Sequence, residues 1–479
     1  MERKNAWKKY TPEQLEQVQK LACGYIDFIS TNKTEREFTA ASRQLAEQCG
    51  YKPLDELIAN GTALKPGDKI WAHTHGKALL LVQLGTEPLV NGLNILGAHM
   101  DSPRLDVKQN PLFEKDDFAL LETHYYGGIK KYQWVTLPMA IHGVIAKEDG
   151  SVETVNVGED AGDPAFCVTD LLIHLGGEQM KKTGSNVVEG EALDLLVGSQ
   201  PLVVEKAGED AAADDEDRPE WEKLAEKEPV KAMALKLLAE KYGMSEEDFL
   251  SAELEIVPAG RARDCGFDRS MVLGYGQDDK VCAYTSLIAQ LHVENPARTA
   301  VTILVDKEEI GSVGATGMHS HFFENAIAEI MELAGEGGML QLKRCLANSR
   351  MLSSDVSAGV DPSYESVFEL KNASYLGRGL VFNKYTGARG KSGSNDASAE
   401  YVAHVRKVMD DADVSFQTAE LGKVDAGGGG TIAYIPAAYN MDVIDSGVPV
   451  LSMHAPWEVT SKADIYEACE GYRAFLINA

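Results

Sequence analysis

The sequence predicts an α/β protein in which one domain is interrupted by an inserted, strand-rich second domain. Strand-like apolar segments alternate with helical periodicity up to about residue 105, and the alternation resumes at Arg263. Between these parts, short runs of alternating apolar and polar residues such as Val152–Val157 are more frequent. A chain of 479 residues is also too long for one simple core. We therefore expect a first domain formed by 1–105 with 262–479, and an inserted domain formed by 106–261.

The composition is that of a globular protein, and it argues against several partners. Hydrophobic residues make up 44% of the chain and charged residues 25%. A net charge of −28 disfavours binding to nucleic acid or to an anionic membrane. The first residues are charged with no apolar run behind them, so we expect no secretory signal. No run reaches the roughly 20 apolar residues of a membrane span. The seven cysteines are scattered without CxxC spacing, so a reducing cytoplasm is expected.

Four further segments complete the prediction of the chain's organisation. Helical periodicity predicts helices over 11–49 and 221–242. The acidic, alanine-rich stretch 206–219 has almost no core-forming residues and predicts a flexible loop. Gly427–Gly430 lacks the Lys-Ser/Thr ending and the strand-loop-helix context of a phosphate loop, so a tight turn is expected there.

The most informative motif follows the first strong strand signal. The apolar run Leu93–Leu96 predicts a buried strand, and His99 and Asp101 come directly after it. In open α/β sheets, ligands bind at the carboxyl ends of the strands. A histidine there can bind a metal through one ring nitrogen, while a nearby carboxylate orients the ring.

Three more strand-like segments are followed by acids or by a histidine. They are Thr299–Val305 with Glu308 and Glu309, Arg350–Leu352 with Asp355, and Val448–Met453 with His454. Two adjacent glutamates can divide their tasks, since one can face a metal and the other the attacked bond. Asp278 and Asp279 open a segment of helical periodicity, where the helix dipole alone would favour carboxylates.

Each of these residues alone has an ordinary structural explanation. A lone histidine after a strand is usually a hydrogen-bonded core residue, paired glutamates are usually surface charge, and a single aspartate is usually a turn residue. Two histidines and at least three acids, each at a strand end or a helix start, together indicate a metallohydrolase. Imidazole and carboxylate ligands without thiolate suit zinc, manganese or cobalt, and one bridging carboxylate suits a two-metal site.

With these motifs the chain resembles the aminopeptidase I zinc metalloproteases, which include the aspartyl aminopeptidases and vacuolar aminopeptidase I. The resemblance covers nearly the whole chain. Its motifs are Gly97–Pro103, Tyr126–Gly128, Ile173–Leu175, Asp278–Asp279, Glu308–Ser312, Ser354–Asp355 and Ser452–His454. The resemblance implies a mixed-sheet, dinuclear zinc exopeptidase-like catalytic domain, and an inserted domain that serves in dimerisation or as a lid.

The resemblance also implies a role for each site residue. His99 and Asp355 would bind one metal ion, Glu309 and His454 the other, and Asp278 would bridge them. Glu308 would be the general base, and Asp101 would orient His99 or support that base. Two Zn²⁺ ions per subunit are expected, with Mn²⁺ or Co²⁺ as alternatives. The preference for Asp278 over Asp279 as the bridge comes from the resemblance and not from local chemistry.

Three segments depart from the family pattern. Asp170 stands where the family commonly has a histidine, and Val356–Pro362 replaces a His-Ala-x-His-Pro sequence. The segment from Phe382 to Asn395 departs from the family's usual basic stretch but keeps three cations: Lys384, Arg389 and Lys391. The sequence is therefore compatible with substrates whose first residue is neutral and with substrates whose first residue is acidic.

These observations predict a cytoplasmic metalloaminopeptidase that removes amino-terminal residues from peptides with a metal-activated water. Its partners would be peptide substrates and copies of itself, in a homo-oligomer such as a dodecamer built from dimers. Two alternatives remain. One is a metallo-amidohydrolase or deacylase of the same architecture, and the other is a catalytically silent, self-assembling scaffold.

Overall fold

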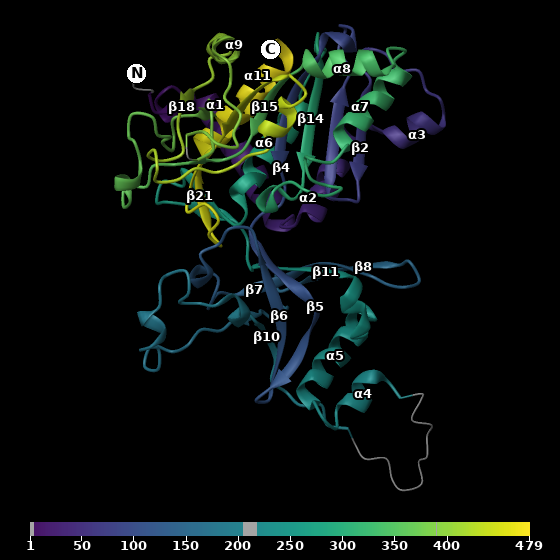
Figure 1. Cartoon of the computed structure of the whole chain (residues 1–479), viewed down its shortest axis with the longest axis vertical. Coiled ribbons are helices and arrows are strands. Elements are labelled where there is room, and N and C mark those ends of the chain that lie inside the picture. Colours follow the sequence, from purple (N-terminus) through teal and green to yellow (C-terminus); the bar gives the residue numbers. More distant parts are fainter. Residues whose placement is uncertain (1–3, 205–217, 389) are drawn as a thin grey trace. The chain divides into compact units, whose positions relative to one another are not determined.

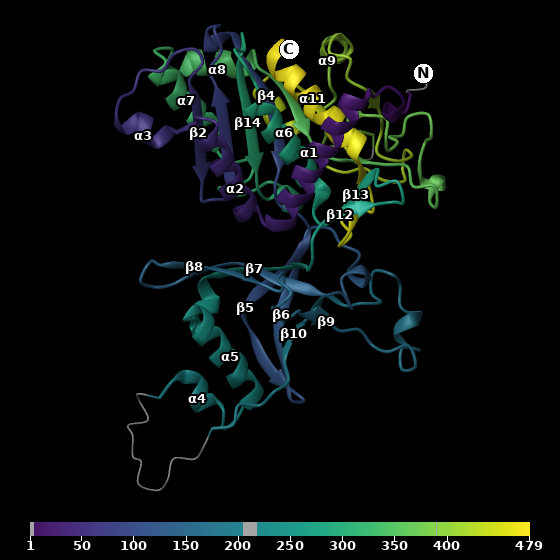
Figure 2. The ribbon, with the colours of Figure 1, turned by 180° about the vertical axis from the view of Figure 1, so that it is seen from behind.

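The computed structural model describes residues 4–204, 218–388 and 390–479. The chain divides into two compact units, one formed by Met1–Ser102 with Arg261–Ala479 and the other by Pro103–Gly260 (Figures 1 and 2). The expected boundaries at 105/106 and 261/262 lie close to these divisions. Most of the acidic loop predicted over 206–219 lies outside the described residues.

A nine-stranded mixed sheet forms the centre of the first unit (Figure 1). Its order is β1 (Lys52–Pro53), β2 (Lys69–Thr74), β3 (Ala78–Gln83), β14 (Thr299–Val305), β4 (Leu93–His99), β15 (Arg350–Ser354), β19 (Asp442–Gly447), β17 (Leu380–Asn383) and β18 (Phe416–Thr418). The four strands β14, β4, β15 and β19 are mutually parallel, so their carboxyl ends meet at one edge. The predicted α/β class with a mixed sheet is thereby confirmed.

Helices cover both faces of this sheet (Figures 1 and 2). In β3, Leu79 and Leu81 belong to one apolar cluster while Leu80 and Val82 belong to the other, as the alternation of side chains in a strand requires. Helices of the first cluster are α1 (Pro12–Thr31), α2 (Glu35–Gln48), α6 (Gln277–Leu291), α9 (Ala399–Asp411) and α11 (Lys462–Asn478). Those of the second are α3 (Leu54–Ala59), α7 (Phe322–Leu333), α8 (Met339–Ala347) and α10 (Tyr434–Ala437).

Two predicted helices are each divided in two. Helix 11–49 breaks at residues 32–34, because Thr34 begins α2 with a capping box in which Glu37 returns the hydrogen bond. Helix 221–242 divides into α4 (Glu220–Leu224) and α5 (Pro229–Tyr242), because Pro229 can start a helix but cannot continue one.

A five-stranded sheet lies beside the central sheet in the first unit, in the order β12 (Arg263–Cys265), β13 (Met271–Gly274), β21 (Glu458–Ser461), β20 (Pro449–Leu451) and β16 (Ser357–Ala358). The strand predicted over 448–453 is only β20, and it belongs to this small sheet. The strand exists as predicted but ends at Leu451, since Ser452 has a positive φ of 60°, which an extended strand does not accommodate. The central sheet instead contains the preceding strand β19.

In the part of the second unit that the structure describes, an antiparallel sheet of seven strands is accompanied by the α-helices α4 and α5. Its order is β8 (Val152–Val157), β7 (Met139–Ala146), β11 (Ala252–Pro258), β5 (Arg104–Lys115), β6 (Phe118–Tyr126), β10 (Leu195–Gly198) and β9 (Cys167–Val168). Every ladder in it is antiparallel.

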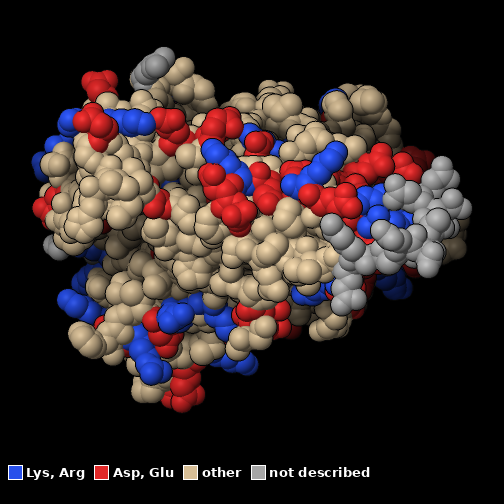
Figure 3. Space-filling model, turned by 90° about the horizontal axis from the view of Figure 1, so that it is seen from below, with Lys and Arg blue, Asp and Glu red and all other residues tan. Residues whose placement is uncertain are grey.

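Two further observations concern the protein surface. Among the described residues, no helix combines the length and apolarity needed to cross a bilayer. On the face drawn in Figure 3, acidic side chains are interspersed with lysines and arginines. The negative charge on that face is therefore not gathered into a single acidic patch.

Candidate metal centre

His99 is the last residue of β4, and its side chain is buried. Its Nδ1 atom lies 3.0 Å from the backbone carbonyl oxygen of Asp101 and 3.2 Å from Oδ1 of the same residue. Because the carbonyl can only accept, Nδ1 carries a proton. Burial opposes protonation of the ring, but the carboxylates of Asp101, Asp278 and Glu308 raise the pKa of His99 above its usual value. A bound cation would take the place of the proton on Nε2 and use the lone pair of that atom.

Asp278 lies between two histidines. It is near the start of α6, where its backbone and that of Asp279 are not yet helical. Its Oδ1 is 3.3 Å from Nε2 of His99, and its Oδ2 is 3.1 Å from Nε2 of His454. Burial opposes ionisation of this carboxyl, but the rings of His454 and His99 hold the pKa of Asp278 below its usual value. Burial raises the pKa of Asp279 instead.

Glu308 and Glu309 occupy a 3₁₀ turn, Glu308–Ile310, that follows β14. Asp101 holds this turn, since its Oδ1 accepts the N–H of Glu308 at 3.2 Å and its Oδ2 accepts the N–H of Glu309 at 3.1 Å. Burial and the charges of Asp278 and Asp101 raise the pKa of Glu308 to about 7, although His99 opposes the shift. Glu308 can therefore exchange a proton near neutral pH.

Asp355 and His454 complete the cluster from two other strand ends. Asp355 follows β15, and its Oδ1 lies 3.9 Å from Nε2 of His99. His454 follows β20, and its Nε2 lies 3.5 Å from Oε1 of Glu309. The strand that His454 follows belongs to the small sheet and not to the central one.

The structure thus brings together all seven residues that the sequence singled out. Within the described chain, potential ligand atoms lie within 4.8 Å of one another in three groups. These groups are His99 with Asp278 and Asp355, Asp278 with Glu309 and His454, and His99 with Glu308 and Glu309. The first two share Asp278, whose two oxygens face different histidines.

The donor set fits divalent cations. Burial and neighbouring negative charges raise the pKa of Glu309 and Asp355, so the cluster lacks positive charge. The buried Oε1 of Glu309, like Nε2 of His99, has no hydrogen-bond partner. Nitrogen and oxygen donors at this spacing are those that zinc accepts.

Two buried acids near the cluster were missed by sequence reasoning. Glu458 accepts hydrogen bonds from the backbone of Asp278 and of His454. Asp445 lies in β19, accepts a hydrogen bond from Thr431, and has its pKa raised to about 7, mainly by burial and also by the charge of Glu308. Asp445 contacts Thr431, 14 residues away, and Glu458 joins His454, four residues away, to Asp278, 180 residues away.

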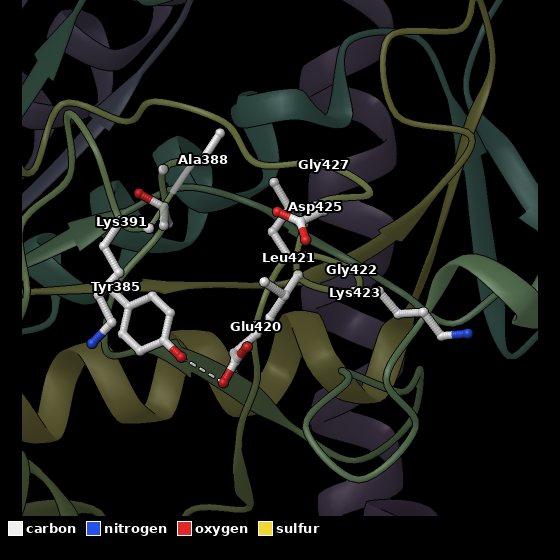
Figure 4. Close-up of a pocket in the computed structure, with 13 residues that line it drawn as sticks. Tyr385, Ala388, Lys391, Glu420, Leu421, Gly422, Lys423, Asp425 and Gly427 are labelled. Atoms are coloured by element: carbon white, nitrogen blue, oxygen red, sulfur yellow. Dashed lines mark hydrogen bonds between the residues drawn. The ribbon is translucent and has the colours of Figure 1, made fainter.

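Lys391, one of the cations singled out from the family pattern, lines a separate cavity of about 210 Å³ formed by residues 385–388, 390–391, 420–425 and 427 (Figure 4). None of the candidate ligands lines it. In Figure 4 the Tyr385 hydroxyl points to Glu420, to which it donates at 2.6 Å. Lys384 and Lys391 both contact the carboxylate of Asp396, at 2.6 and 2.9 Å. Arg389 lies outside the described residues.

Asp170, which stands at the expected histidine position, is an exposed residue of the second unit. Its Oδ1 accepts hydrogen bonds from the backbone of Leu171 and from the side chain of Gln179, each at 2.8 Å. These contacts support the local turn of the chain.

The fold and the buried group of imidazoles and carboxylates define a metal-dependent hydrolase. The model of the aminopeptidase I zinc metalloprotease family (M18) matches residues 28–476. The chain belongs to this family and is a peptidase. Zinc is the metal that the family description implies.

Three comparisons illustrate the relationship. A Clostridium acetobutylicum protein described as "Probable M18 family aminopeptidase 1" is 58% identical over 477 residues, which cover 100% of this chain and 98% of that protein. The crystal structure of an M18 family aminopeptidase from Thermotoga maritima covers 100% of both chains, with a TM-score of 0.91 and 42% identity. The S. cerevisiae mApe1 dodecamer structure, at 18% identity, a TM-score of 0.75 and 96% coverage of both chains, shows the fold alone.

Proposed function

We propose that this protein is an aminopeptidase that holds two zinc ions per subunit. His99 and Asp355 bind one ion, Glu309 and His454 bind the other, and Asp278 bridges them. The observation that carries the proposal is the position of Asp278, whose two carboxylate oxygens lie 3.3 and 3.1 Å from two different histidines. A carboxylate shared by two ligand groups is the arrangement that a two-metal hydrolase requires.

Glu308 is the general base of the proposed reaction. Bound zinc supplies Lewis-acid polarisation of the scissile carbonyl and lowers the pKa of a coordinated water. Glu308 accepts the proton of the attacking water and returns it to the leaving amine. Burial raises the pKa of Glu308 to about 7 in the metal-free chain, and bound cations would favour the ionised form that a general base needs. Asp101 holds the backbone of Glu308 and the ring of His99, so it fixes the base relative to the ligands.

The substrate is a peptide with a free amino terminus, which binds among the remaining carboxylates. Neutral and acidic first residues are both accepted in this proposal. The contacts of Lys384 and Lys391 with Asp396 support this breadth, because two cations that already face a carboxylate attract a substrate carboxylate less strongly.

The protein acts in the cytoplasm as a homo-oligomer in this proposal, with a dodecamer built from dimers as the expected form. The second unit provides subunit contacts or a lid. Exposed apolar side chains in this unit support the proposal, since Ile173 is 71% exposed and Leu175 is 69% exposed. The S. cerevisiae protein of the same fold is described as a dodecamer.

The test is the initial hydrolysis rate across short peptides with free or acetylated amino termini, with and without a chelator. We expect chelator-sensitive release from free termini alone, and the panel also gives the preferred first residue. Cleavage of the acetylated peptides would instead indicate an amidohydrolase. Absence of turnover in zinc-loaded protein would contradict the proposed activity.

A further inference from the structure

Glu458 connects two parts of the candidate metal centre that are far apart in the sequence. It is the first residue of β21, and its side chain is buried. Its Oε1 accepts the backbone N–H of His454 at 2.9 Å, and its Oε2 accepts the backbone N–H of Asp278 at 3.1 Å. One carboxylate therefore holds the main chain of two candidate ligands.

Glu458 is itself held firmly. Glu458 pairs with Gly274 in the antiparallel ladder between β13 and β21. Its backbone carbonyl accepts a hydrogen bond of 2.6 Å from the side-chain amide of Gln277, which also donates to the carbonyl of Val272 at 3.2 Å. Anchoring at both its backbone and its side chain leaves the carboxylate little freedom to move.

The arrangement parallels that of Asp101 on the other side of the cluster. Asp101 accepts the N–H groups of Glu308 and Glu309, as Glu458 accepts those of Asp278 and His454. Each buried carboxylate thus fixes one pair of site residues through the main chain.

We propose that Glu458 is a positioning residue that holds Asp278 and His454 at the spacing needed for the ion bound by Glu309 and His454. This inference rests on the proposed two-zinc function. Glu458 acts through the two ligands and contacts neither substrate nor ion. The other ion should depend on it less, because Ser102 also holds Asp278 by donating to its carbonyl at 2.6 Å.

The substitution Glu458→Gln should remove one of the two hydrogen bonds that join Asp278 and His454 through this side chain. The amide offers one oxygen, so one of the two N–H groups faces an NH₂ group and loses its acceptor. Loss of such an outer contact typically weakens metal binding by about 10- to 100-fold. We expect that loss for one of the two zinc ions and a much smaller change for the other. Glu458→Asp keeps the charge, but its shorter side chain reaches only one N–H, so the same selective loss is expected.

Glu467→Gln is the matched control. Glu467 is also buried, and it accepts a backbone N–H from Ser415 at 2.6 Å and the Tyr10 hydroxyl proton at 2.8 Å, away from the candidate ligands. This variant measures the general effect of replacing a buried glutamate. It should bind both zinc ions as the unmodified protein does.

The experiment titrates metal-free, full-length protein with zinc against a chromophoric chelator, after circular dichroism has established that each variant is folded. The expected result is two tight sites in the unmodified protein and in Glu467→Gln, and one weakened site in both Glu458 variants. Raised zinc should restore kcat in Glu458→Gln, which would not occur for a residue taking part in the chemistry.

The outcomes separate the inference from the proposed function. Two unchanged sites in a folded Glu458 variant would overturn the inference alone. Equal weakening of both sites, or kcat that excess zinc does not restore, would also overturn it. Fewer than two sites in the unmodified protein would overturn the proposed two-zinc function, and the inference with it.

Discussion

The Oδ2 atom of Asp278 lies 3.1 Å from the Nε2 atom of His454. These residues come from the start of α6 and from the end of β20, so the contact joins a helix of the central layers to the small sheet. The other oxygen of Asp278 faces His99. A single side chain therefore links the two ligand groups, and the first prediction concerns it.

Asp278→Asn should abolish tight binding of both zinc ions, because an amide cannot supply two anionic oxygens. Asp279→Asn should retain both ions, since Asp279 belongs to none of the ligand groups and burial raises its pKa. Metal content after dialysis, measured by mass spectrometry, distinguishes the variants. The reverse pattern would make Asp279 the bridge.

Glu308→Gln should reduce kcat by about 10²- to 10⁴-fold, the usual contribution of a general base. Zinc content should stay the same, because the proposed ligands are other residues. The measurement pairs peptide hydrolysis with metal analysis of the same sample. Activity close to that of the unmodified enzyme would show that another group accepts the proton.

Strands buried on both faces were the part of the fold that the sequence predicted best. The predicted run Thr299–Val305 coincides with β14, because central parallel strands are almost continuously apolar. β19 was missed, since Asp445 and Ser446 interrupt its apolar pattern although both are buried. A buried acid gives no periodic signal when its partner is distant in the chain.

In the candidate site, too, some residues could be predicted from the sequence and others could not. His99 and Glu309 could be singled out because each follows a recognisable strand. The choice of Asp278 over Asp279 came from the family resemblance, because the local sequence does not distinguish two adjacent aspartates at a helix start. Glu458 escaped notice although His454 is only four residues away, because its second partner, the N–H of Asp278, is 180 residues away.

Gly447→Ala should destabilise the protein and weaken metal binding together. An added Cβ atom would lie 1.7 Å from the backbone oxygen of Asp355, so the main chain beside this candidate ligand must shift. Such overpacking costs about 1–3 kcal/mol. Gly162→Ala is the control, because its added Cβ would meet no atom within 4 Å. Equal melting temperatures for the two variants would refute this expectation.

Ionisation of the buried Asp445 side chain should lower the free energy of unfolding as pH rises. Its pKa is about 7 in the folded protein and about 3.9 when unfolded, so between these values only the folded state holds the proton. The folded state therefore loses stability as pH rises from about 4 to 7. Asp445→Asn removes this effect, so its melting temperature relative to the unmodified metal-free protein should be higher at pH 8 than at pH 5. If the melting temperatures of the two proteins changed with pH in the same way, the raised pKa of Asp445 would be contradicted.

Ile173→Asp should reduce assembly, because a charge replaces an apolar side chain that is 71% exposed in the single chain. His174→Asp is the control, since it introduces the same charge at the neighbouring exposed position without removing apolar surface. Light scattering reports the mass of each variant. A monomeric unmodified protein, or equal assembly in both variants, would contradict the proposed role of this segment.

The proposed ligands are spread from His99 to His454, and this order has a consequence for biosynthesis. At about 5–20 residues per second, translation separates these two histidines by roughly 20–70 seconds. Throughout that interval the growing polypeptide has an incomplete ligand set. On the proposed ligand assignment, the growing chain therefore cannot hydrolyse peptides before His454 has been translated.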